Sequence, residues 1–139
     1  MALTPKQASQ QAGGGSDIIG WKLDRAQRRE LLARFPPKYR DEVADHVTLA
    51  TKVPRKAELP GDVAAEIVGR ADDGNGVEAM VVRLEGTTDR PDGSTYHITW
   101  SLDKARGRKA KESNDVIARL GWEPIDPPIP VKLTPARWP

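Results

Sequence analysis

The stretch Tyr96-His97-Ile98-Thr99-Trp100-Ser101-Leu102 alternates polar and apolar side chains with a period of two. An earlier stretch, Asp45-His46-Val47-Thr48-Leu49-Ala50-Thr51, repeats this design. A period of two is typical of a half-buried strand, because successive strand side chains point to opposite faces of a sheet. Each stretch is therefore predicted to form a strand with an imidazole and a hydroxyl on one face and a core-facing apolar side on the other.

The rest of the chain predicts a mixture of strands and two helices. Besides the His strands at 46–53 and 95–103, we expect strands at 18–23, 63–70, 77–84 and 131–133. The turn 72–76 (DDGNG) is a strong hairpin signal. One helix is expected at 25–35 with Asp24 as its N-cap, and another from Ser113 or Asn114 to Leu120, closed by Gly121. Segments 38–45, 122–130 and 135–139 are expected to be a connector, an extended Pro-rich stretch and a tail. This order predicts an α+β domain built on mainly antiparallel sheet.

Length and composition limit the class of protein. The 139 residues suit one domain, which we place at 17–139 after a flexible N-terminal segment at 1–16. The sequence holds no apolar run long enough to span a membrane. It contains no cysteine, which excludes disulfides and thiolate metal sites and fits a cytoplasmic location. The net charge of +2 is too small to indicate a partner.

The two histidines of the chain, 51 residues apart, each begin a His-x-Thr triplet. A single strand histidine is more often structural, but this duplicated context favours a shared site. Imidazole is the side chain best suited to proton transfer near neutral pH. If His46 and His97 lay on opposite sides of a phosphodiester, one would accept a proton and the other would donate one. The hydroxyls of Thr48 and Thr99 would then bind the non-bridging phosphate oxygens.

Neither a metal nor another cofactor is expected for this chemistry. A mononuclear zinc site takes three or more protein ligands, and the chain offers two histidines and no cysteine. Asp45, next to His46, would complete a ligand set only if a further carboxylate folded in.

Paired His-x-Thr triplets on two strands of a small α+β domain resemble the 2H phosphoesterase superfamily. The resemblance implies a bilobal fold, in which two mainly antiparallel sheets with flanking helices face each other across a cleft. It implies metal-independent cleavage of RNA-type phosphodiesters, with His46 and His97 as the acid/base pair and Thr48 and Thr99 as the phosphate-binding hydroxyls. The segment from Tyr96 through Ser101, together with the basic loop and Glu112-Ser113-Asn114, is similar to the cyclic phosphodiesterase portion of fungal tRNA ligases and related RNA-repair-like proteins. It is also similar to phage 2H nucleases.

Further residues are candidates for substrate contacts. Five of the nine residues in 103–111 are basic, and phosphates are attracted to such a run. A solvated loop is the alternative reading. Ser113 and Asn114 are either phosphate-binding or ordinary capping residues. Two aromatic residues on connecting segments are candidates for base stacking. The candidate contacts are Tyr39, Lys104, Arg106, Arg108, Ser113, Asn114 and Trp122.

Three functional hypotheses follow. The first is a hydrolase for RNA ends with a 2′,3′-cyclic phosphate or for cyclic or oligo-nucleotides, with a phage-type nuclease that degrades cyclic oligonucleotide defence signals as its variant. The second is an RNA- or nucleotide-binding module without turnover. The third is a structural domain whose His strands merely pair. The sequence does not indicate the oligomeric state, the preferred substrate, or which histidine is the base.

Overall fold

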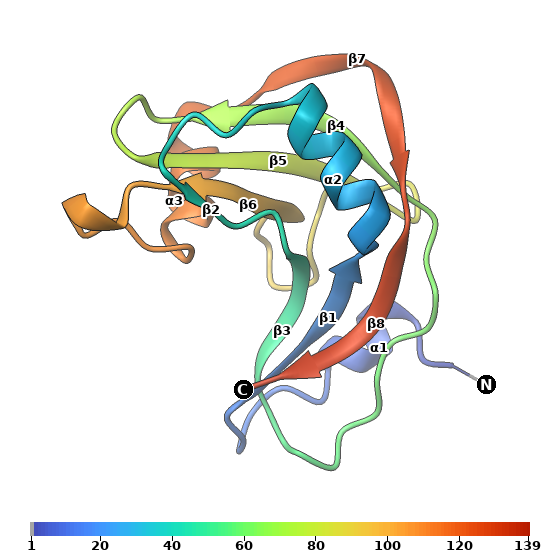
Figure 1. Cartoon of the computed structure of the whole chain (residues 1–139). Helices are drawn as coiled ribbons and strands as arrows, with labels where there is room; N and C mark the ends of the chain where they lie inside the picture. Colours follow the sequence, from blue (N-terminus) through green and yellow to red (C-terminus); the bar gives the residue numbers. More distant parts are fainter. Residues whose placement is uncertain (1) are drawn as a thin grey trace.

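The structure is a computed structural model of the chain, and it describes residues 2–139. Its strands form two antiparallel sheets, one with the order β3-β1-β8 and one with the order β2-β6-β5-β4-β7 (Figure 1). This architecture confirms the predicted α+β class with antiparallel sheet. The strands are β1 (Asp17–Leu23), β2 (Asp41–Glu42), β3 (His46–Val53), β4 (Ala65–Asp72), β5 (Val77–Leu84), β6 (His97–Leu102), β7 (Glu123–Val131) and β8 (Leu133–Trp138). The helices are α1 (Pro5–Ser9), α2 (Arg25–Arg34), the 3₁₀ turn η1 (Lys104–Arg106) and α3 (Glu112–Leu120).

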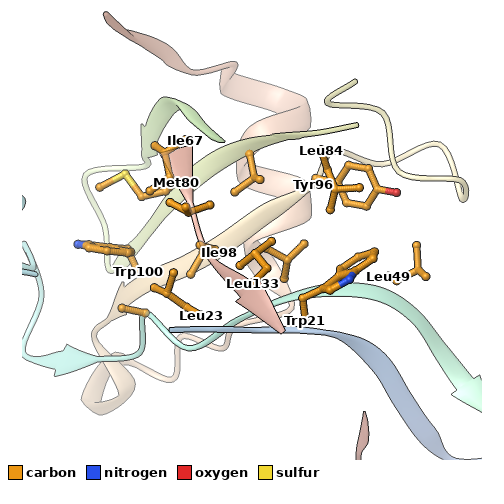
Figure 2. Packing of buried hydrophobic residues seen from close by; sticks show 14 of the residues in the cluster. Trp21, Leu23, Leu49, Ile67, Met80, Leu84, Tyr96, Ile98, Trp100 and Leu133 are labelled. Carbon is orange, nitrogen blue, oxygen red and sulfur yellow. The ribbon is translucent and has the colours of Figure 1, made fainter. Parts of the chain in front are cut away.

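The main hydrophobic core joins the two sheets. Side chains from the three-stranded sheet, such as Trp21 and Leu49, pack with side chains from the five-stranded sheet, such as Met80 and Ile98 (Figure 2). A second, smaller cluster brings Val116 and Ile117 of α3 against the other face of the five-stranded sheet. As a result β5, in the middle of that sheet, is buried along nearly its whole length.

The two His strands lie next to each other, although they belong to different sheets. The predicted alternation holds in both of them. Val47 and Leu49 of β3 are buried in the main core, as are Ile98 and Trp100 of β6. The His and Thr side chains therefore occupy the opposite face of each strand. The burial of the apolar face of each strand thus determines where its polar face points.

The N-terminal segment differs from the flexible lead expected there. Residues 5–9 form α1, whose N-cap is Thr4 and whose Ala8 is fully buried. The side chain of Gln11 is bonded twice to the backbone of Glu58, which fastens the segment to the loop before β4. Met1 lies outside the described residues.

The second helix prediction was wrong at its start. Helix α3 begins at Glu112, so Ser113 and Asn114 lie in its first turn and neither is the N-cap. The Glu112 carboxylate instead accepts a hydrogen bond from the backbone N–H of Lys109, at 2.9 Å. The end of the helix at Gly121, with φ +71°, is as predicted. Asp24 likewise caps α2 as predicted, with its carboxylate accepting from the N–H of Gln27.

Proline hides two strands from sequence-based prediction. The Pro-rich stretch after Trp122 is strand β7, and the expected tail at 135–139 belongs mostly to β8. Both are edge strands, where a proline can sit without breaking a ladder on both sides. The connector at 38–45 also contains a short strand, β2, paired with β6. Among residues 2–139, no helix is both long and apolar enough to cross a membrane.

Candidate active site

Both His-x-Thr triplets line one cavity of about 340 Å³. His46 and Thr48 come from β3, and His97 and Thr99 come from β6. The sequence pattern had indicated that the triplets share a site, and the packing of β3 beside β6 brings them together. A larger hollow of about 570 Å³ lies between α1 and the segment before β6, but it contains neither histidine. The other residues that line the smaller cavity are Ile18, Thr51, Arg90, Ala110, Lys111, Asn114, Trp138 and Pro139.

A carboxylate orients the first histidine. His46 Nδ1 lies 3.0 Å from Oδ2 of Asp45, and the same carboxylate binds Lys22 and Arg25. Burial raises the pKa of Asp45, but the hydrogen bonds from Lys22, His46 and Arg25 outweigh burial and hold that pKa well below its usual range. Asp45 is therefore ionised and accepts the Nδ1 proton. Burial lowers the pKa of His46, and the Asp45 carboxylate acts in the opposite direction.

A backbone carbonyl orients the second histidine. His97 Nδ1 lies 2.8 Å from the carbonyl oxygen of Thr95. A carbonyl only accepts, so Nδ1 carries the proton of the neutral ring and Nε2 has the free lone pair. Burial lowers the pKa of His97, and the positive charges of Arg90 and His46 lower it further. In both imidazoles the hydrogen-bonded nitrogen is Nδ1, and Nε2 has no hydrogen-bond partner among residues 2–139.

Ser113 positions one of the threonine hydroxyls. The Thr99 hydroxyl lies 2.9 Å from the Ser113 hydroxyl and donates to the carbonyl of Ala110 at 3.3 Å. Ser113 is fully buried and lies outside the cavity lining. Its predicted role as a substrate contact is thus replaced by a contact with Thr99.

Asn114 does line the cavity, as the sequence predicted for a substrate contact. Its Oδ1 atom is buried and accepts no hydrogen bond from residues 2–139. A buried polar atom without a partner costs about 1–3 kcal/mol.

Among the lining residues that were not predicted as site residues, two are cations and one is a tryptophan. Arg90, 8% exposed, forms a forked pair with Asp92 and brings a guanidinium to the cavity. Lys111 adds a second cation at the start of α3. The ring of Trp138 lies 4.5 Å from that of His46 and forms an apolar wall. The tail assignment concealed Trp138, and no local pattern marks Arg90.

The remaining candidate contacts lie away from this cavity. The Tyr39 hydroxyl donates to Asp72, and burial together with this carboxylate raises the pKa of Tyr39 to about 12. Trp122 packs on Gly69, where a Cβ atom would overlap the indole ring. Both residues lie near a separate hollow at the far end of β4, which Trp122 and Asp72 line.

Two arginines of the basic run are engaged in ion pairs. Arg108 binds Asp73 and Glu112, and Arg106 binds Asp103. Lys104 and Arg108 line a second hollow. Ala110 lines both this hollow and the cavity of the two histidines. No group of three or more His, Cys, Asp or Glu side chains within residues 2–139 is arranged to hold a metal ion.

Comparison of the chain with protein-family models, curated proteins and solved structures found no match.

Proposed function

We propose that the protein is a phosphodiesterase that acts on RNA-type phosphodiesters by two-histidine general acid/base catalysis without a metal. The observation that carries this proposal is the meeting of both His-x-Thr triplets in one cavity. Each imidazole has its Nδ1 fixed and its Nε2 free, as a proton donor or acceptor in such a reaction requires. The resemblance to 2H phosphoesterases, including their bilobal arrangement, remains part of the proposal.

The reaction follows from the roles of the side chains. One imidazole takes a proton from the attacking water, whose oxygen forms a bond to phosphorus. The other imidazole donates a proton to the leaving ribose oxygen as its bond to phosphorus breaks. The hydroxyl of Thr48 and the guanidinium of Arg90 are candidates for stabilising the charge on the non-bridging oxygens. The Thr99 hydroxyl joins them when its proton turns from the Ala110 carbonyl to the phosphate. The net reaction consumes one water and opens one phosphodiester.

The lining favours a small nucleotide group as the ligand of the cavity itself. A volume of about 340 Å³ is at the lower end of small-molecule sites. Trp138 and Ile18 provide an apolar wall next to the imidazoles, which suits the flat face of a base. A nucleotide with a terminal 2′,3′-cyclic phosphate, or a cyclic nucleotide, is small enough for the cavity and has a base to pack on the apolar wall.

A cleavage assay in excess EDTA tests the proposal. The panel contains 2′,3′-cyclic mononucleotides, an RNA that ends in a 2′,3′-cyclic phosphate, 2′–5′ oligoadenylate, and 3′–5′ cyclic di- and trinucleotides. We expect turnover that EDTA does not abolish, with the 2′,3′-cyclic substrates preferred. Preference for the cyclic oligonucleotides would instead support the phage-type defence function. Folded protein that turns over no member of the panel would support the binding module.

Asp45→Asn tests the positioning of His46. The amide removes the negative charge that raises the pKa of His46, so that pKa should fall further. In a bell-shaped profile of kcat/KM against pH, we expect the limb set by His46 to move to lower pH. The limb set by His97 should move less, because Asp45 acts on His97 only indirectly, through the charge of His46. Movement of the ascending limb would identify His46 as the base, and movement of the descending limb would identify it as the acid.

The matched control for this variant is Asp92→Asn. Asp92 is also a carboxylate paired with an arginine at this site, but its partner is Arg90 and not an imidazole. Its replacement should leave the limb set by His46 unmoved. An Asp45→Asn profile with both limbs unchanged, from protein with the wild-type unfolding midpoint, would show that Asp45 has no catalytic influence.

A further inference from the structure

The loop at 103–111 has a geometry that the catalytic proposal does not use. It borders a hollow of about 440 Å³ that adjoins the catalytic cavity, since Ala110 lines both. The Ala110 carbonyl accepts the hydrogen bond from Thr99, so the loop is tied directly to the catalytic strand β6. A ligand that extends out of the cavity past Ala110 would therefore enter this hollow.

The loop exposes cations that remain available to a ligand. Lys104, Lys109 and Lys111 are exposed, and none of them forms an ion pair within the described part of the chain. Lys111 lines the catalytic cavity, whereas Lys104 and Lys109 line the neighbouring hollow. The positive charge thus continues from the cavity along the loop.

The loop is held in place before any ligand binds. Arg108 fastens it to Asp73 at 2.8 Å and to Glu112 at 3.0 Å, and it also donates to the carbonyl of Asn75. The backbone N–H of Lys104 donates to Asp41 at 2.9 Å. Because the backbone is already fixed, ligand binding does not have to order it. Arg106 and Arg108 are thus engaged in ion pairs within the protein. Lys104, Lys109 and Lys111 remain available to contact a ligand.

We propose that this loop binds the phosphates of an RNA strand whose 3′ end occupies the catalytic cavity. The inference rests on the proposed function, which places a phosphodiester between the two histidines. Lys104 and Lys109 would contact upstream phosphates, and the apolar side of the hollow, with Val43 and Leu102, would face a ribose or base. A single-stranded RNA fits better than an acidic protein, because its backbone continues from the phosphate in the cavity.

The test compares two substrates, 2′,3′-cyclic AMP and a short oligoribonucleotide that ends in a 2′,3′-cyclic phosphate. In the double variant Lys104→Ala/Lys109→Ala, we expect kcat/KM for the oligonucleotide to fall about tenfold at low salt. The slope of log(kcat/KM) for the oligonucleotide against log[salt] should become shallower by about 1.4, because two phosphate contacts on a single strand contribute about that much. Turnover of 2′,3′-cyclic AMP should be unchanged. The control is Lys56→Ala/Lys132→Ala, which removes two exposed lysines outside the loop and should affect neither substrate.

Fluorescence anisotropy with the same oligonucleotide measures RNA affinity independently of turnover. It therefore separates a failure of the proposed phosphodiesterase function from a failure of RNA binding by the loop. If wild-type protein turns over neither substrate, the proposed function fails, and affinity alone decides whether the loop is an RNA surface. Equal RNA affinity and turnover in the double variant and the wild type would overturn the inference, as would an equal loss on both substrates. Displacement of the RNA by polyglutamate at equal charge concentration would show that the surface binds an acidic protein instead.

Discussion

His46→Ala and His97→Ala are each expected to lower kcat/KM for a 2′,3′-cyclic phosphate substrate by about 10²–10⁴-fold. This range is the usual contribution of one general acid or base to a reaction rate. The physical reason is the free Nε2 of each ring, which is the proton donor or acceptor that the cavity offers. Initial rates in EDTA, measured for both variants beside the wild type, give the result directly.

The double variant sharpens the test. If both imidazoles act in the same step, removal of the second should cost far less than removal of the first, since groups that act as a unit are strongly non-additive. Unchanged unfolding midpoints would show that the loss is chemical. Wild-type rates in either single variant would contradict the two-histidine mechanism.

Glu78→Ala is expected to lower the free energy of unfolding by about 3 kcal/mol, near the lower end of the range for breaking a buried ion pair. Glu78 is fully buried in β5, and its carboxylate accepts hydrogen bonds from Arg70, from the Ser101 hydroxyl at 2.7 Å and from the backbone N–H of Lys38 at 3.0 Å. The substitution leaves all three donors without this acceptor. The side chain of Arg70 is about a quarter exposed, so water offsets part of the loss.

The matched control is Glu66→Ala in the neighbouring strand β4. Glu66 also pairs with an arginine across the ladder, Arg83, but both side chains are about a third or more exposed. Exposed ion pairs are worth about 0–1 kcal/mol, so this variant should unfold within about 1 kcal/mol of the wild type. Urea unfolding monitored by tryptophan fluorescence measures the free energy of unfolding of both variants. Equal losses in the two variants would show that burial does not set the cost.

Alternation made the two His strands predictable, whereas the ion pairs of Arg106 and Arg108 in the basic run were not predicted. In β3 and β6 a local pattern suffices, because the side that faces the core fixes the side that faces the cavity. The anchoring of Arg108 by Asp73 depends on a carboxylate that lies far along the chain. The burial of Ser113 under Thr99 likewise depends on where α3 begins. Neither outcome is encoded in a local pattern of residues.

Strand β8 was not predicted from the sequence for a different reason. Its interior proline and lack of alternation predict a tail, but pairing with β1 gives it a ladder that runs from Leu23↔Leu133 to Ile18↔Trp138. Such pairing between the two ends of a chain is not visible in any short window of sequence. Trp138, and with it the apolar wall of the cavity, was missed for this reason.

The pairing of β1 with β8 also determines when the site forms during synthesis. Strand β1 is followed closely in the sequence by its partner β3, but its second neighbour, β8, comes only after strands β4 to β7. The cavity wall beside His46 is therefore completed only after β8 has been synthesised. Contacts so distant in sequence close slowly, because the entropy of a long loop is lost before the contact forms. Until then the nascent protein holds its first histidine in an open, incomplete site.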